Sequence, residues 1–220
     1  MSPHKKTHDL RVDLEVIANL VVNNARVLDL GCGNGALLDY LIHSKNARGF
    51  GVEISHEGVH ACITRGVPVY HGDIDQGLLD HLDDSFDYVI LSHTLQTIQK
   101  PRFVLQEMLR VGKKVIVSFP NFGHWRVRMQ LVLHGRMPVT HQLPYHWYDT
   151  PNIHPCTVVD FLALCRELPV RVLEQIPLGS TGHRPDGLIK GWLAGQLSHP
   201  AVANLLAPMV VFLLGKEQQS

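Results

Sequence analysis

The chain has 220 residues, of which 45% are hydrophobic, enough to enclose the core of one α/β domain. Lys plus Arg and Asp plus Glu both number 20, so no net charge favours nucleic acid or membrane binding. The four cysteines have no paired spacing, no signal-peptide pattern is present, and the longest apolar run, 205–214, is too short to span a bilayer. We therefore expect a reduced, soluble protein of the cytoplasm.

Strand and helix patterns alternate along the chain. Apolar residues at helical spacing between residues 10 and 21 predict an amphipathic helix. Strand patterns follow at about 26–30, 48–53, 67–70, 86–92, 113–119, 170–176 and 209–215, with helical patterns between them. This order predicts one α/β domain over residues 1–220, with a doubly wound, Rossmann-like sheet of seven strands.

Two long connections interrupt the alternation. Residues 120–156, after the fifth strand, are dense in Pro, His and aromatic residues, and we expect this insertion to cover a ligand cleft or to dock a partner. Trp125, Arg128, Trp147 and Tyr148 give it the composition of an interface, although a solvated helix face is an equal alternative. A second insertion, 178–207, contains Trp192 and separates the last two strands.

The first predicted strand runs into a glycine-rich loop. Residues 27–35 read Val-Leu-Asp-Leu-Gly-Cys-Gly-Asn-Gly, and a helical pattern begins at Ala36. This arrangement places a ligand at a helix N-terminus with no side chain in its way. Asp29, two residues before Gly31, would repel a pyrophosphate and attract an ammonium or sulfonium group. The loop therefore favours S-adenosylmethionine or S-adenosylhomocysteine as the ligand.

Acids after the second and third predicted strands support this choice. Glu53 is placed to bind both ribose hydroxyls, and Asp73 to bind the exocyclic amine of an adenine. The alternative is a dinucleotide, because the spacing from Gly31 to Ala36 also fits that fingerprint; Asp73 alone is more simply a helix cap. The predicted cofactor-binding residues are Asp29, Gly31, Cys32, Gly33, Gly35, Glu53, Ile54, Asp73, Ile74 and Ser92.

Several blocks beyond the glycine loop resemble the MetW family of methionine biosynthesis proteins. The most specific are residues 118–125, 135–140 and 147–154, and the resemblance covers about residues 10–176. It implies a class I methyltransferase fold, S-adenosylmethionine binding and a role beside a homoserine O-acetyl- or O-succinyltransferase of the MetX type. The alternative function is a methyltransferase that acts on a small metabolite, because fold and cofactor do not determine the reaction.

Candidate catalytic and metal-binding residues are few. His93 and His124 follow the fourth and fifth strands, where a base facing a methyl acceptor would lie, although for each a structural hydrogen bond is the simpler reading. Residues 56–60 match the H-E-x-x-H zinc motif, but a glycine within it weakens the helix, so we expect no metal. The fourth strand lacks the Pro-Pro-aromatic turn that grips a flipped base, so we expect no nucleic-acid substrate.

Overall fold

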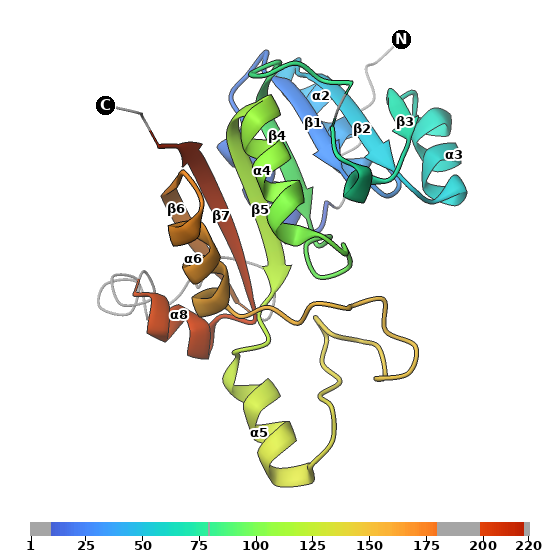
Figure 1. The fold of residues 1–220 in the computed structure, drawn as a ribbon. Helices are drawn as coiled ribbons and strands as arrows, with labels where there is room; N and C mark the ends of the chain where they lie inside the picture. The colour runs from blue at the N-terminus through green and yellow to red at the C-terminus, as the bar shows by residue number, and fades with distance from the viewer. Residues whose placement is uncertain (1–9, 79, 180–198, 218–220) are drawn as a thin grey trace.

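The computed structural model describes residues 10–78, 80–179 and 199–217, which form one seven-stranded sheet in the order β3-β2-β1-β4-β5-β7-β6 (Figure 1). Strand β7 is antiparallel to both of its neighbours, and the other pairs are parallel. The strands are β1 (Arg26–Leu30), β2 (Arg48–Glu53), β3 (Val69–His71), β4 (Phe86–Ser92), β5 (Gly112–Pro120), β6 (Val170–Leu178) and β7 (Met209–Lys216).

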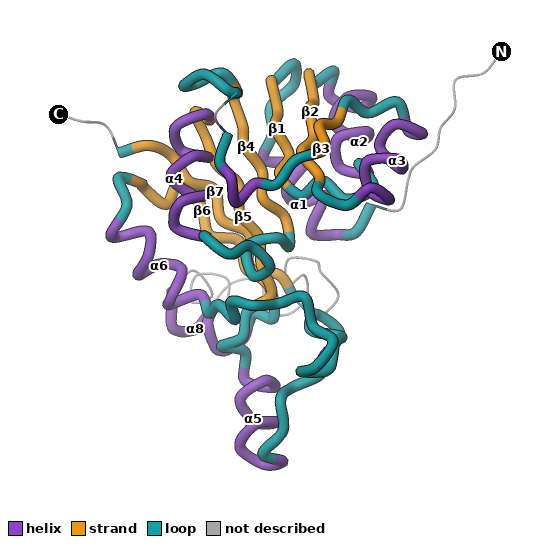
Figure 2. The backbone as a smooth tube through the Cα atoms, turned by 45° about the vertical axis from the view of Figure 1, so that its right-hand side comes forward, coloured by secondary structure: helices purple, strands orange, loops and turns teal. Residues whose placement is uncertain are grey.

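Helices cover both faces of the sheet, as expected for a doubly wound fold. The helices are α1 (Val12–Leu20), α2 (Ala36–Lys45), α3 (His56–Arg65), α4 (Pro101–Val111), α5 (Trp125–His134), α6 (Val158–Glu167) and α8 (Pro200–Leu206). Helices α4 and α6 lie on one face, and α1 and α2 lie on the other (Figures 1 and 2). Helix α5 lies on neither face and extends away from the sheet.

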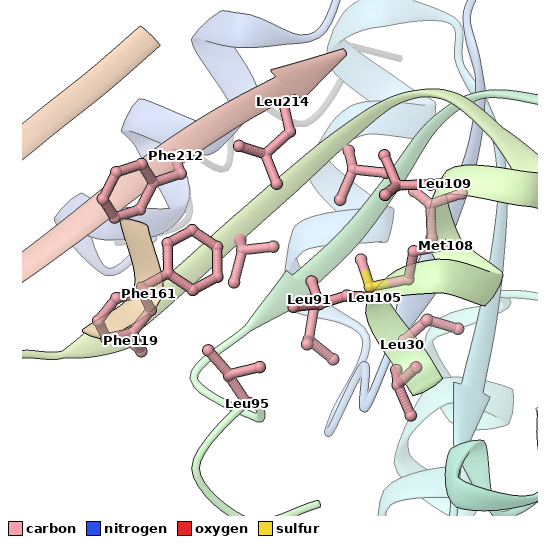
Figure 3. Packing of buried hydrophobic residues seen from close by; sticks show 14 of the residues in the cluster. Leu30, Leu91, Leu95, Leu105, Met108, Leu109, Phe119, Phe161, Phe212 and Leu214 are labelled. Atoms are coloured by element: carbon pink, nitrogen blue, oxygen red, sulfur yellow. The ribbon is translucent and has the colours of Figure 1, made fainter. Parts of the chain in front are cut away.

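Each face of the sheet has its own apolar cluster. On the side of α4 and α6, Phe119 of β5, Phe161 of α6 and Phe212 of β7 pack with ring centroids 4.7–5.9 Å apart (Figure 3). Aromatic pairs of this kind contribute about 0.5–1.5 kcal/mol each beyond the burial of their area. The other cluster joins α1 and α2 to the opposite face of the strands. The central strands are therefore buried on both sides, which explains their continuous apolar sequences.

One connection differs from the prediction. Between β3 and β4, the described residues contain only a single 3-10 turn, η1 (Ile74–Gln76), where we expected a helix. The side chain of Asp73 accepts a hydrogen bond from the backbone nitrogen of Asp75, and Gly77 follows with a φ of +94°. Side-chain bonds to the local backbone compete with helix formation, and a left-handed glycine ends it.

The first insertion forms a projecting segment, which we call the arm and define as residues 122–156. It leaves the carboxyl end of β5, contains α5 and a long loop, and returns to the start of α6 (Figure 2). Its ends meet, because the backbone nitrogen of Phe122 donates to the carbonyl of Cys156 at 3.0 Å. The carbonyl of Gln96, after β4, accepts from the backbone nitrogens of Ile153 and His154 at 2.9 and 3.0 Å. Most of the second insertion, with Trp192, lies outside the described residues.

Candidate functional site

The glycine loop joins β1 to α2 between the ends of β2 and β4. Gly31, Gly33 and Gly35 have φ values of +68°, +54° and +73°, in the left-handed region that favours glycine. At Gly31 the space is also closed, because an added Cβ would lie 2.7 Å from the hydroxyl oxygen of Thr94. The backbone nitrogen of Gly31 donates to the carbonyl of Val52 at 2.8 Å, so the loop is held against β2.

Two buried thiols, those of Cys32 and Cys62, pack against the glycine loop on its interior side. The sulfur of Cys32 lies 3.7 Å from that of Cys62 on α3, and Cys62 donates to the carbonyl of Gly33 at 3.3 Å. Gly51 of β2 makes room for Cys32, because an added Cβ there would lie 2.5 Å from the Cys32 sulfur. Burial raises the pKa of both thiols, so they stay protonated and pack rather than act as nucleophiles.

Asp29 has the most unusual environment of the predicted residues. It lies near the end of β1, between β2 and β4, and is only 3% exposed. Burial first, and the neighbouring charge of Glu53 second, raise its pKa from 3.8 to about 8. Its Oδ1 atom is buried without a hydrogen-bond partner. A buried carboxyl oxygen without a partner is unfavourable in the free protein, and a ligand with a cationic or hydrogen-donating group would satisfy it.

Glu53 connects the glycine loop to the start of α3. One carboxylate oxygen accepts from the backbone nitrogen of Gly33 and the other from that of Ser55, both at 2.8 Å. Each carboxylate oxygen has two acceptor positions, so these bonds leave capacity for a ligand hydroxyl. Ser55 in turn caps α3 by accepting from the backbone nitrogen of Gly58. Glu53 is therefore both a structural acceptor and a candidate ribose-binding group.

A cavity of about 600 Å³ opens beside Asp29. Its wall includes the glycine loop and side chains from α1, α3 and the segment after β4. The lining residues with polar side chains are Arg11, Asp29, Cys32, Asn34, Arg65, Ser92, His93 and Thr94. Arg11 pairs with Asp13 at 2.9 Å and Arg65 with Asp39 at 3.8 Å, so the cavity wall combines a buried carboxyl group with two arginines that are already paired. Such a wall offers acceptors to the cationic end and donors to the anionic end of a zwitterionic ligand.

His93 lines this cavity in a strained backbone conformation, with a φ of +55° that few non-glycine residues adopt. Its Nε2 atom lies 3.4 Å from Oδ2 of Asp13 and 3.2 Å from the sulfur of Met209. Burial lowers the pKa of His93, partly opposed by the charge of Asp13. The ring is therefore neutral near pH 7 and able to accept a proton.

A second cavity, of about 700 Å³, lies beyond the ends of β2 and β3. Ile54 and Asp73 line it, together with Tyr70 and His71. Asp73 also caps η1, which is the structural role considered for it from the sequence, and its place on the cavity wall leaves adenine binding as a prediction. Glu53 is adjacent to both cavities. It accepts a hydrogen bond from Gly33, which lines the first cavity, and it lies opposite His71, which lines the second, in the pairing of β2 with β3. An elongated ligand that passes Glu53 would occupy both.

The structure gathers most of the predicted cofactor residues at these two cavities. Gly35, Glu53 and Ile74 line neither cavity, and Ile74 belongs to the apolar core. His124 lies apart, where it precedes α5 and lines a third cavity of about 180 Å³, so the two candidate bases are not brought together. The first cavity is also lined by Arg11, Arg65 and Thr94, which the sequence did not predict as site residues.

Metal-ligand clusters and membrane-length helices are both absent from the described part of the chain, residues 10–78, 80–179 and 199–217. No group of three or more His, Cys, Asp or Glu side chains there is placed to hold a metal ion. Within the zinc-like motif, His56 stacks on His71 at a centroid distance of 4.3 Å. None of the helices in those residues is both long and apolar enough to cross a membrane.

Comparison with known sequences identifies a family. The family described as "Methionine biosynthesis protein MetW" matches residues 11–204. The "Bifunctional methionine biosynthesis protein MetXA/MetW" of Rhodopirellula baltica is 39% identical over 176 residues. That alignment covers 76% of this chain and 28% of the relative, so the chain spans less than a third of the relative's length.

Solved structures with the same fold are numerous and distant in sequence. An S-adenosylmethionine dependent methyltransferase from Mesorhizobium loti has a TM-score of 0.65 at 16% identity, over 93% of this chain and 98% of that one. A methyltransferase from Aquifex aeolicus has a TM-score of 0.59 at 12% identity, over 94% and 93%. The [4+2]-cyclase SpnF has a TM-score of 0.63 at 17% identity, over 94% and 81%. These likenesses establish the class I methyltransferase fold.

Proposed function

The chain belongs to the MetW family of methionine biosynthesis proteins, and from that premise we propose that it binds S-adenosylmethionine and acts with a homoserine O-acyltransferase of the MetX type. The single observation that carries the ligand is Asp29, which lines the first cavity and has a buried carboxyl oxygen without a partner. A cationic ligand would satisfy that oxygen and draw the Asp29 pKa down from about 8.

The remaining groups fit the parts of this ligand. The methionine end would lie on the glycine loop, with its cationic groups toward Asp29 and its carboxylate toward the N-terminus of α2. Glu53 would accept from the ribose hydroxyls, and the adenine would lie in the second cavity near Ile54 and Asp73. A dinucleotide fits less well, because a pyrophosphate offers no cationic or hydrogen-donating group to the unpartnered oxygen of Asp29.

The partner is supported by the relative from R. baltica, whose name joins a MetXA and a MetW part in one protein. Two activities fused in one chain are held at high effective concentration, which is useful when their separate counterparts must associate. The four cysteines are all free thiols, which supports a reducing compartment such as the cytoplasm.

The second candidate function is methyl transfer to a small metabolite. His93 favours it, because a neutral imidazole on the cavity wall is able to take a proton from an acceptor. The bound ligand would supply an activated methyl group, so the chain's own residues need chiefly to position the acceptor. The cyclase SpnF shares this fold, however, and shows that the fold does not determine the reaction.

One experiment separates the two functions. The cognate homoserine acyltransferase is supplied with homoserine and its acyl donor, alone and together with the purified chain and S-adenosylmethionine, and acylhomoserine is measured. The chain with S-adenosylmethionine is also incubated with a small-metabolite extract as the source of methyl acceptors, and adenosylhomocysteine is measured. We expect the chain to raise acylhomoserine production without forming adenosylhomocysteine. Catalytic formation of adenosylhomocysteine that His93→Ala abolishes would favour methyl transfer, and the absence of any effect on the acyltransferase would contradict the proposed partner.

A further inference from the structure

The arm carries an exposed apolar surface. Side chains on α5 and on the loop after it contribute Met129, Leu131, Val132, Leu133, Trp147 and Tyr148. Val132 is 77% exposed and Trp147 is 72% exposed. Large apolar side chains that are exposed on one projecting segment are typical of a surface that another molecule covers. We call these six residues the arm patch.

The position of the arm keeps the patch away from the sheet. Figures 1 and 2 show α5 projecting beyond the carboxyl ends of the parallel strands, with its outer half apart from the other helices. An apolar helix face is stable only when something covers it. The loop part is ordered by its own rings, because Tyr148 stacks on His146 at 5.4 Å and meets Trp147 edge-on at 5.8 Å.

The charge of the arm indicates what kind of surface would cover it. Residues 122–156 contain three arginines, at positions 126, 128 and 136, and a single acid, Asp149. Two copies of the chain joined through their arm patches would bring these arginines together, which is unfavourable. Arg128 is engaged within the arm, where its Nε donates to the carbonyl of Gly123 at 2.7 Å. The composition of the arm therefore favours an apolar groove with an acidic rim on a different protein over a second copy of this chain.

We infer that the arm patch is the docking surface for the MetX-type acyltransferase, through an apolar groove rimmed by acidic side chains. The identity of the partner rests on the proposed function, and the location of the surface rests on the exposure and charge of the arm. Tryptophan, tyrosine and arginine, which are enriched where binding energy concentrates, occur together here. No residue of the arm lines either cavity at the glycine loop, so docking and cofactor binding are separable.

Two substitutions on the patch and one matched control test this inference. Val132→Asp and Trp147→Ala change exposed residues of the arm, and Leu82→Asp changes an 81% exposed leucine before β4. The affinity of each full-length variant for the purified acyltransferase is measured by calorimetry, together with its affinity for S-adenosylmethionine. We expect both arm variants to bind the acyltransferase at least about tenfold more weakly, with Leu82→Asp close to the unchanged chain.

The possible outcomes separate an error in the proposed docking surface from an error in the proposed partner. If the unchanged chain does not bind the acyltransferase, the proposed function fails and this inference with it. If it binds and both arm variants bind equally well, only the docking surface is wrong. Sedimentation and anionic-vesicle binding are measured on the same proteins. An arm-dependent dimer or arm-dependent vesicle binding, with acyltransferase affinity retained, would assign the patch to a second copy or to a membrane and overturn the inference.

Discussion

Asp29 destabilises the free protein, and a substitution should reveal this. Its pKa is 3.8 ordinarily and about 8 in the folded chain, so the folded state binds more protons between these values. The free energy of unfolding therefore falls as pH rises from about 4 to 8. Asn does not titrate, so we expect Asp29→Asn to be more stable than the unchanged chain at pH 8, by about 1–3 kcal/mol.

Urea unfolding of both proteins at pH 5 and pH 8 measures this effect. The advantage of Asp29→Asn should be larger at pH 8 than at pH 5, because the unchanged Asp29 is mostly protonated at the lower pH. The same variant should lose most of its affinity for S-adenosylmethionine. An equal effect at both pH values would mean that the buried carboxyl group does not titrate as its surroundings indicate.

Glu53 should affect ligand binding more than folding. Glu53→Ala removes charge-assisted acceptors, each worth about 1.5–3 kcal/mol, so we expect S-adenosylmethionine to bind about tenfold to a hundredfold more weakly. Calorimetry measures this, and Glu57→Ala, at an exposed position in the first turn of α3, is the control. Unchanged affinity would contradict a ribose-binding role, and loss of folding would mean that the bonds to Gly33 and Ser55 are chiefly structural.

For single residues, the sequence predicts the site residues that lie at the ends of strands. It does not predict those that reach the site from helices or from the backbone before them. Asp29 and Ser92 line the first cavity as expected, because their place at strand ends can be read from the apolar runs before them. Arg11, just before α1, and Arg65, at the end of α3, reach the same cavity, and position in the sequence alone does not say which residue points there. The strained backbone of His93 also has no sequence signal, since its residue type does not require it.

At the scale of the elements, Asn121 connects the end of β5 and the base of the arm to α8. Its side-chain nitrogen donates to the carbonyls of Asn204 and Ala207 at 2.8 Å, and its oxygen accepts from the backbone nitrogen of Gly123 at 2.8 Å. We expect Asn121→Ala to lower the free energy of unfolding by about 2–4 kcal/mol, because it leaves buried backbone groups without partners.

Urea unfolding and ligand calorimetry together test this role. Asn121 lines neither cavity at the glycine loop, so its loss should leave S-adenosylmethionine affinity within about threefold, a change below ~1 kcal/mol. Asn152→Ala, on the arm, is the control for the substitution itself. A stability equal to that of the unchanged chain would show that water replaces the lost bonds.

The elements themselves follow closely from the sequence. All seven strands lie within two residues of the predicted bounds, because buried strands require continuous apolar runs whose ends polar residues mark. The sheet order and the antiparallel β7 do not follow from such runs, since they depend on which strand ends meet in space. The sequence does not reveal that the segment after β3 lacks an α-helix. Its apolar residues fit a helical pattern, but Asp73 and Gly77 limit the segment to one 3-10 turn.

For the whole molecule, ligand binding should appear as thermal stabilisation. A ligand at about a hundredfold excess over its dissociation constant adds about 2.7 kcal/mol, or about 5–10 °C in the melting temperature of a chain of this size. We expect this shift with S-adenosylmethionine or S-adenosylhomocysteine in a thermal melt. NAD should give none, and a larger shift with NAD than with either would reverse the choice of ligand made from Asp29.

The closed base of the arm has a consequence for how such proteins diversify. The backbone of Phe122 is hydrogen-bonded to that of Cys156, so the arm, which has more than thirty residues, leaves and rejoins the sheet domain at neighbouring points. A chain that enters and exits at the same point is inserted, shortened or exchanged without moving the strands on either side. A change in the length or sequence of the arm would therefore alter the surface that the protein presents while leaving the sheet and the glycine loop in place.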